Sequence, residues 1–202
     1  MPQLALIVRP SSSAPKEGFA SHVQAMAATT PGTRQVCLPS RPPRISVIPF
    51  SARPAAMLLA DAVPAPAEGV EVHAYRVETS EPLEGPAEGP AMITLFSRRS
   101  GLSTAKFMSL WHEGHSPLAL SVHPLVRYTR HRVLEALADA PPRDGIVLEM
   151  TARPEDLTST VRFFGGPLAA VPNMVRIGLD ARRFLDLSTL ENQLVEVRAP
   201  ST

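Results

Sequence analysis

Residues 92–133, MITLFSRRSGLSTAKFMSLWHEGHSPLALSVHPLVRYTRHRV, carry the strongest local patterns in this chain. They begin with an apolar strand at residues 92–96 and continue through a polar turn into a helix with Phe107, Trp111 and His115. These three side chains are four positions apart, so they are expected on one face of the helix. The only tryptophan and four of the six histidines lie in this stretch, which predicts a functional site rather than ordinary core.

A spaced set of aromatic, histidine and proline residues runs through the same stretch. It consists of Phe107-x-x-x-Trp111-x-x-x-His115-x-Pro117-Leu118, followed by Arg127-Tyr128-x-x-His131. This pattern resembles the EthD family of the ferredoxin-like dimeric α+β barrels, and the similarity extends over roughly residues 92–197. The resemblance implies the fold but no single reaction, because relatives include decarboxylases, dehydratases, isomerases and cyclases.

Length and composition narrow the class of protein. The chain has 202 residues, of which 44% are hydrophobic, enough for one large domain or two small ones with a core. Its net charge is +1 and its basic residues form no run, which argues against a nucleic-acid partner. A lone Cys37 rules out an internal disulfide and is typical of a reducing compartment. The sequence shows no signal peptide and no apolar run of the roughly 20 residues that span a bilayer. We therefore expect a cytoplasmic monomer or homodimer without a membrane partner.

The first 78 residues show short apolar strands and amphipathic helices. Alternation and flanking Pro, Gly and Ser residues predict four strands, at residues 4–8, 34–38, 45–50 and 70–77. Helical spacing predicts a helix that begins near Phe19 and ends before Pro31, and Pro54 is well placed to begin a second helix at residues 54–62. Residues 79–91 are rich in Glu, Pro and Gly and are interpreted as a linker.

Residues 92–202 repeat this order of elements. Strands are predicted at residues 92–96, 125–134, 145–150 and 190–197, and helices at residues 103–115 and 155–164, with residues 165–187 irregular. Two short motifs also line up, Val47-x-x-x-Ser51-Ala52-Arg53-Pro54 and Val147-x-x-x-Thr151-Ala152-Arg153-Pro154. The sequence therefore predicts an α+β fold of two tandem ferredoxin-like repeats, residues 1–78 and 92–202, of which the first is a degenerate copy.

The two repeats have a physical reason to associate. A ferredoxin-like unit covers one face of its sheet with helices and leaves the other face bare. Relatives bury the bare face by dimerising, whereas a chain with two copies can bury it internally. We expect the two sheets to pack against each other within one chain, around a barrel-like cavity.

His115 is the candidate acid or base, because an imidazole can move protons at neutral pH. At the end of a helix its cation would also gain from the negative end of the helix dipole. Tyr128 and His131, on the following strand, are candidate catalytic partners that would stabilise charge on a substrate oxygen. Side chains three positions apart on a regular strand point to opposite faces of the sheet. Tyr128 and His131 can therefore face the same cavity only if a bulge or bend lies between them. A structural role for one of them therefore stays open.

Five further residues are candidates for substrate binding: Phe107, Trp111, Arg127, His73 and Tyr75. The two aromatic residues of the helix would line the approach to His115, although packing in the core is their ordinary alternative. The arginine could hold a carboxylate, or form a surface ion pair. The histidine and tyrosine alternate on the strand at residues 70–77, so they share one face and could line the cavity from the opposite sheet.

The histidines of the central stretch also raise the alternative of a metal site. His112 and His115 are three apart on a helix, which allows two ligands to share one ion. No acidic residue stands at a clear ligand spacing, and Glu113 would point away from both histidines. His112 and His123 are instead expected on the surface. We therefore expect neither a metal nor another cofactor.

These features favour a cofactor-independent lyase or isomerase that acts on a small aromatic or polyketide-like compound. Decarboxylation, dehydration and cyclisation each need one group that moves a proton and others that hold the charge developing on oxygen. The alternative is a non-catalytic binding or accessory protein of an oxidative catabolic pathway. A cavity onto which two titratable groups converge would favour the enzyme.

Overall fold

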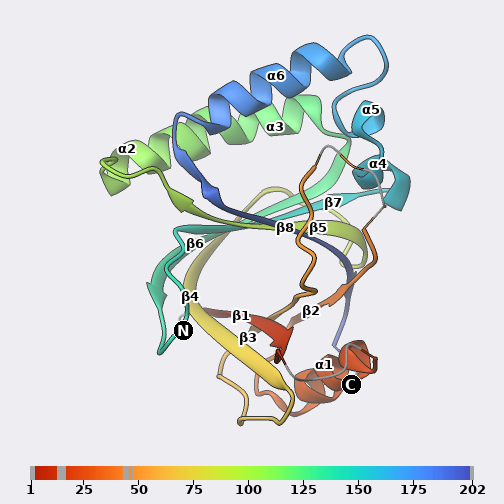
Figure 1. Cartoon of the computed structure of the whole chain (residues 1–202), viewed down its shortest axis with the longest axis vertical. Coiled ribbons are helices and arrows are strands. Elements are labelled where there is room, and N and C mark those ends of the chain that lie inside the picture. Colours follow the sequence, from red (N-terminus) through yellow and green to blue (C-terminus); the bar gives the residue numbers. More distant parts are fainter. Residues whose placement is uncertain (1–2, 13–16, 43–45, 47, 201–202) are drawn as a thin grey trace.

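The computed structural model describes residues 3–12, 17–42, 46 and 48–200. Within these residues, antiparallel strands form a closed barrel in the order β1-β3-β2-β8-β5-β7-β6-β4 (Figure 1). The strands are β1 (Gln3–Pro10), β2 (Gln35–Pro39), β3 (Ala56–Ala60), β4 (Val70–Leu83), β5 (Gly89–Arg98), β6 (Leu125–Ala136), β7 (Gly145–Thr151) and β8 (Leu185–Arg198).

Both halves of the chain use the same strand order. The first four strands lie in the order β4-β1-β3-β2 and the last four in the order β8-β5-β7-β6, so each half places its fourth strand beside its first and its third beside its second. The halves join where β2 pairs with β8 and where β4 pairs with β6. The predicted α+β fold of tandem ferredoxin-like repeats is confirmed, and the two sheets face each other across one barrel.

The interior of the barrel is a packed apolar core. All seven residues of β7 are buried, and they alternate between the two faces of the sheet. Ile146, Leu148 and Met150 point into the barrel, where they join aliphatic side chains from the other strands. Val147 and Glu149 point outward, toward the helices. The expected barrel-like cavity is therefore largely filled, and the space beside His115 lies outside the barrel.

Helices cover the two sides of the barrel. Helix α1 (Phe19–Thr29) packs Phe19, Val23 and Met26 on the outer face of the first-half strands. The other helices lie on the opposite side, over the strands of the second half (Figure 1). They are α2 (Thr104–Met108), the π-helix η1 (Ser109–His115), α3 (Ser116–Val122), α4 (Pro154–Thr158), α5 (Thr160–Phe163) and α6 (Ala170–Ala181). None of the helices in the described part of the chain is long and apolar enough to cross a membrane.

The helix that carries His115 does not end there. Helix α2, the π-helix and α3 follow one another without a break, because His115 and Ser116 both have helical backbone angles. His115 therefore lies in the middle of a longer helix, and the predicted gain from a helix end is wrong.

Two predicted elements of the first half differ in the structure. Residues 54–62 were predicted as a helix, but Ala56–Ala60 form strand β3, whose five residues are all buried. A strand buried on both faces has a continuous apolar sequence, which periodicity cannot distinguish from a buried helix. The strand predicted at residues 45–50 lies partly outside the described residues, and its described end makes only an isolated bridge from Phe50 to Asn192.

Two predicted irregular segments are regular in the structure. Within residues 79–91, interpreted as a linker, β4 continues to Leu83 and β5 begins at Gly89. Within residues 165–187, helix α6 forms despite Pro172, because proline is tolerated in the first turn of a helix. The paired Ala-Arg-Pro motifs are not equivalent either, since Pro154 follows the third strand of its half and Pro54 precedes it.

Candidate active site

A cavity of about 320 Å³ lies between the helices of the second half and the outer face of their sheet. Its walls are largely apolar, with Met92 from β5, Phe163 at the end of α5, and Met174 and Ile177 from α6. Six groups with acid, base or hydrogen-bonding chemistry also line it: Thr94, His115, His123, Glu149, Arg182 and Asn192. Such a mainly apolar cavity with a few polar groups is typical of small-molecule sites.

His115 is held by a carboxylate on the facing helix. Its Nδ1 lies 3.0 Å from Oδ2 of Asp180 on α6, and Arg183 holds the other oxygen of that carboxylate at 2.9 Å. Because the carboxylate accepts the Nδ1 proton, Nε2 of the neutral ring is the nitrogen available as a base. Burial lowers the pKa of His115, and the bond to Asp180 opposes that shift. The π-helical turn that carries His115 is a local irregularity that is frequent at functional sites.

His123 is a buried residue of the same cavity, so its expected place on the surface is wrong. Its Nδ1–H donates to the carbonyl oxygen of Phe163 at 2.8 Å, and its ring stacks on that phenylalanine at 3.9 Å between centroids. Burial lowers the pKa of His123 to about 4. The ring is therefore neutral at physiological pH, with Nε2 as its remaining acceptor.

Glu149 is the carboxyl group of the cavity, and it was missed in the sequence. It lies on β7 with its side chain outward and buried, and burial raises the pKa of its carboxyl to about 7. At neutral pH such a group can either donate or accept a proton. The signal that could have revealed it is the single charged residue in the apolar strand GIVLEMT.

Replacing Glu149 with glutamine is expected to stabilise the protein at alkaline pH. The pKa of the carboxyl rises from 4.5 to about 7 on folding, so between these values the folded state keeps a proton that the unfolded state has lost, and stability falls as pH rises. Above this window the wild type carries a penalty of about 3 kcal/mol, which disappears below about pH 4.

Urea unfolding of both proteins at about pH 4 and about pH 8 measures this difference. The glutamine variant should be more stable than the wild type only at the higher pH. Equal stability at alkaline pH would contradict the burial of a charged Glu149.

Tyr128 and His131 lie on opposite faces of β6. Tyr128 points toward the helices, where its hydroxyl is 3.3 Å from Oγ of Ser116 and where burial raises its pKa. His131 points into the barrel, and its Nδ1–H donates to Oγ1 of Thr79 at 2.9 Å. Burial lowers the pKa of His131 to about 4. The structure thus separates both side chains from the cavity that His115 lines.

The five predicted substrate-binding residues lie in three different parts of the structure, none of them in the His115 cavity. Phe107 and Trp111 belong to an aromatic cluster with Phe96 and Phe184 and are almost completely buried. Arg127 forms an ion pair with Glu81 on β4. His73 and Tyr75 share a second cavity, of about 370 Å³, with Arg9 and Arg143 at one end of the barrel.

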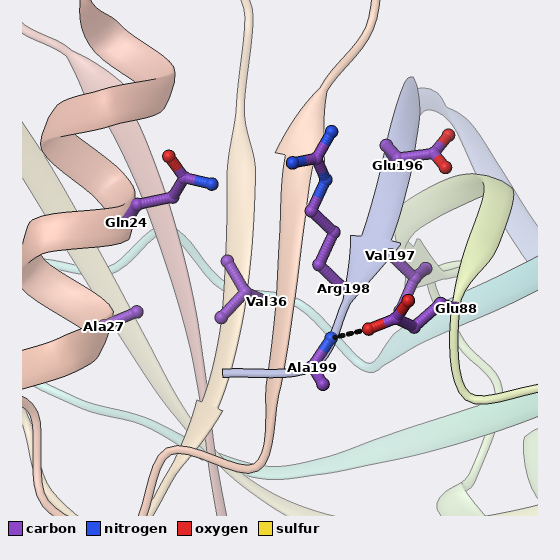
Figure 2. A pocket seen from close by; sticks show the side chains of 8 residues that line it. All are labelled: Gln24, Ala27, Val36, Glu88, Glu196, Val197, Arg198 and Ala199. Atoms are coloured by element: carbon purple, nitrogen blue, oxygen red, sulfur yellow. Dashed lines mark hydrogen bonds between the residues drawn. The ribbon is translucent and has the colours of Figure 1, made fainter. Parts of the chain in front are cut away.

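Figure 2 shows a further hollow, of about 440 Å³, between α1, β2 and the end of β8. It is lined by Gln24, Ala27, Val36, Glu88, Glu196, Val197, Arg198 and Ala199. Its Ala199 N–H donates to Oε1 of Glu88 at 2.9 Å. Glu88 and Arg198 are exposed, and the set contains no histidine or cysteine, so this hollow lacks the buried acid and base groups of the His115 cavity. Among the described side chains no group of three or more His, Cys, Asp or Glu is placed to hold a metal ion.

Comparisons with known proteins support the fold. No protein-family model matches the chain, which leaves the resemblance to the EthD family without confirmation, and no curated protein matches it in sequence. A candidate monooxygenase from Lactobacillus acidophilus NCFM superposes with a TM-score of 0.55 at 7% identity, over 100% of this chain and 98% of that one. A candidate monooxygenase from Fusobacterium nucleatum subsp. nucleatum superposes with a TM-score of 0.50 at 6% identity, over 99% and 93%. At these identities the likeness establishes a shared fold and nothing further.

Proposed function

We propose that this protein is an enzyme of the lyase or isomerase type that moves a proton on a small aromatic or polyketide-like compound, without a cofactor, in the His115 cavity. One observation carries the proposal. Two titratable groups on different elements, His115 with its Asp180 partner and Glu149 with a pKa raised to about 7, line one mainly apolar cavity. Pairs of groups with such tuned proton affinities are characteristic of acid–base sites.

The arrangement suggests a division of roles. Nε2 of neutral His115 accepts a proton from an acidic C–H or O–H of the substrate, and the Asp180 carboxylate stabilises the imidazolium that results. Glu149 in its protonated form donates to the oxygen on which negative charge develops. The rings of Phe163 and Phe164 give the cavity an apolar wall for an aromatic body. Glu149 thus takes the part that the sequence offered to Tyr128 or His131.

Deuterium exchange into 2-tetralone, an aromatic ketone with acidic C–H bonds, tests the proposal. The protein is incubated with this ketone in buffered D2O, and uptake of deuterium is followed by mass spectrometry. The wild type should exchange these positions faster than buffer alone and faster than the His115→Gln variant. Exchange no faster than buffer, with binding of the ketone seen by calorimetry, would favour the non-catalytic binding protein instead.

A second candidate function comes from the two structural neighbours, which are described as candidate monooxygenases. The same base would deprotonate a phenol, and the electron-rich phenolate is the form that reacts with oxygen. Oxygen consumption with 1-naphthol distinguishes this chemistry from proton transfer alone. Uptake of oxygen that depends on His115 would favour oxygenation, whereas exchange without uptake favours the lyase or isomerase.

A further inference from the structure

A second cavity, separate from the His115 site, opens at one end of the barrel. It has a volume of about 370 Å³ and shares no lining residue with the His115 cavity. Among the described residues, three arginines line it, Arg9 from β1, Arg53 and Arg143, but only one acidic residue, Glu191 from β8. A cavity with this balance of charge is suited to an anion.

The three arginines of this cavity have one carboxylate partner fewer than they have positive charges. Arg53 pairs with Glu71 at 2.8 Å, so it is neutralised from outside the cavity. Arg9 and Arg143 share Glu191, at 2.6 Å and 3.4 Å, and among the described residues neither has another acidic partner. None of the residues outside the described part of the chain is Asp or Glu.

The two arginines that share one carboxylate have largely buried side chains. The side chain of Arg9 is 8% exposed and that of Arg143 is 14% exposed. A cation held in such a place without a counter-ion is costly, because water cannot solvate it fully. An anion that entered the cavity would therefore remove an existing penalty.

Arg143 has hydrogen-bond donors that the described residues do not use. Its Nη1 donates to the carbonyl oxygen of Thr189 at 3.1 Å, whereas its Nη2 reaches Glu191 only at 3.4 Å. Its Nε is buried and has no hydrogen-bond partner among the described residues. Nε and Nη2 form the edge of a guanidinium that binds a carboxylate through two parallel hydrogen bonds.

We propose that this cavity binds a small organic carboxylate. Arg143 turns its Nε and Nη2 edge to the carboxylate and Arg9 adds a second positive charge. The apolar body of the ligand rests against Tyr75, Leu95 and Pro141, which line the same space. This site is independent of the proton transfer proposed for His115, since the two cavities are separate.

Calorimetric titration with benzoate at constant ionic strength tests the site, with benzamide as the neutral analogue of the same shape. Benzoate should bind and benzamide should not. The Arg143→Gln variant should weaken benzoate binding by about tenfold or more, the usual scale for a lost charge-assisted contact. Arg132→Gln is the matched control, because Arg132 pairs with Glu78 away from this cavity, and it should bind benzoate as the wild type does.

The Glu191→Gln variant separates ligand binding from a purely structural ion network. Removing the resident carboxylate should tighten benzoate binding, because Arg9 and Arg143 then lack the acidic partner that they share. Thermal unfolding with benzoate should show a larger rise in Tm for this variant than for the wild type.

Three results would overturn the proposal. They are equal affinity of the wild type and Arg143→Gln for benzoate, binding of benzamide as tight as that of benzoate, and no gain in benzoate affinity in folded Glu191→Gln. Tighter binding of inorganic phosphate than of benzoate would overturn the assignment to a carboxylate.

Discussion

The His115→Gln variant is expected to lose about a hundredfold or more in the rate of deuterium exchange into 2-tetralone, the scale of a lost acid or base group. Glutamine keeps a similar size and can still bond to Asp180, but it cannot carry a proton at neutral pH. The free energy of unfolding should therefore change little. Parallel measurement of kcat for exchange and of urea unfolding checks both parts of the expectation.

Two further variants sharpen this test. His115→Ala should lose the same activity, and Asp180→Asn should lose part of it, because the amide keeps a hydrogen-bond partner for the ring but no longer stabilises the imidazolium. If His115 only fastened α6 to its neighbouring helix, glutamine would restore activity and alanine would lose it only along with folded protein. A stably folded, fully active His115→Gln protein would contradict the proposed role.

Replacing Trp111 with alanine is expected to cost about 3–5 kcal/mol in the free energy of unfolding, as for other large buried aromatic residues. Trp111 is 1% exposed, and its ring lies 5.0 Å from that of Phe96 and 5.5 Å from that of Phe107. The space beneath it is also tight, since a Cβ on Gly145 would lie 2.8 Å from its ring. Its loss would leave a cavity that this cluster cannot close.

Trp111→Phe is the control for that prediction. Phenylalanine fills much of the space, so it should cost clearly less stability than alanine, and exchange of 2-tetralone should persist in the folded protein. Urea unfolding and exchange rates for both variants provide the measurement. A near-normal stability of Trp111→Ala with a selective loss of ketone binding would contradict a core role. Trp111 would then be assigned to substrate binding.

Much of the fold could be predicted because its signals are local. The strands near Leu4, Met92 and Ile146 show as apolar runs bounded by turn residues, and the repeated order of elements indicated two related halves. Where local signals are ambiguous the prediction was wrong. The run Ala56–Ala60 has no periodicity, and Pro172 hid the start of α6.

The site itself was only partly predictable, because it depends on contacts between distant segments. His115 stood out by its motif, but its partner Asp180 lies 65 residues further along the chain. The raised pKa of Glu149 comes from burial under helices that a strand sequence does not reveal. The alternation rule did foresee that Tyr128 and His131 face opposite ways. It could not indicate which side of the sheet holds the cavity.

Nuclear magnetic resonance of the histidine ring nitrogens tests the central claim most directly, which is that the ligand occupies the cavity beneath the helices and not the barrel. The ¹⁵N-labelled protein is titrated with 2-tetralone. The ring signals of His115 and His123 should shift with ligand concentration, while that of His131, held inside the barrel by Thr79, should stay in place. A shift of the His131 signal without change at His115 and His123 would contradict this account.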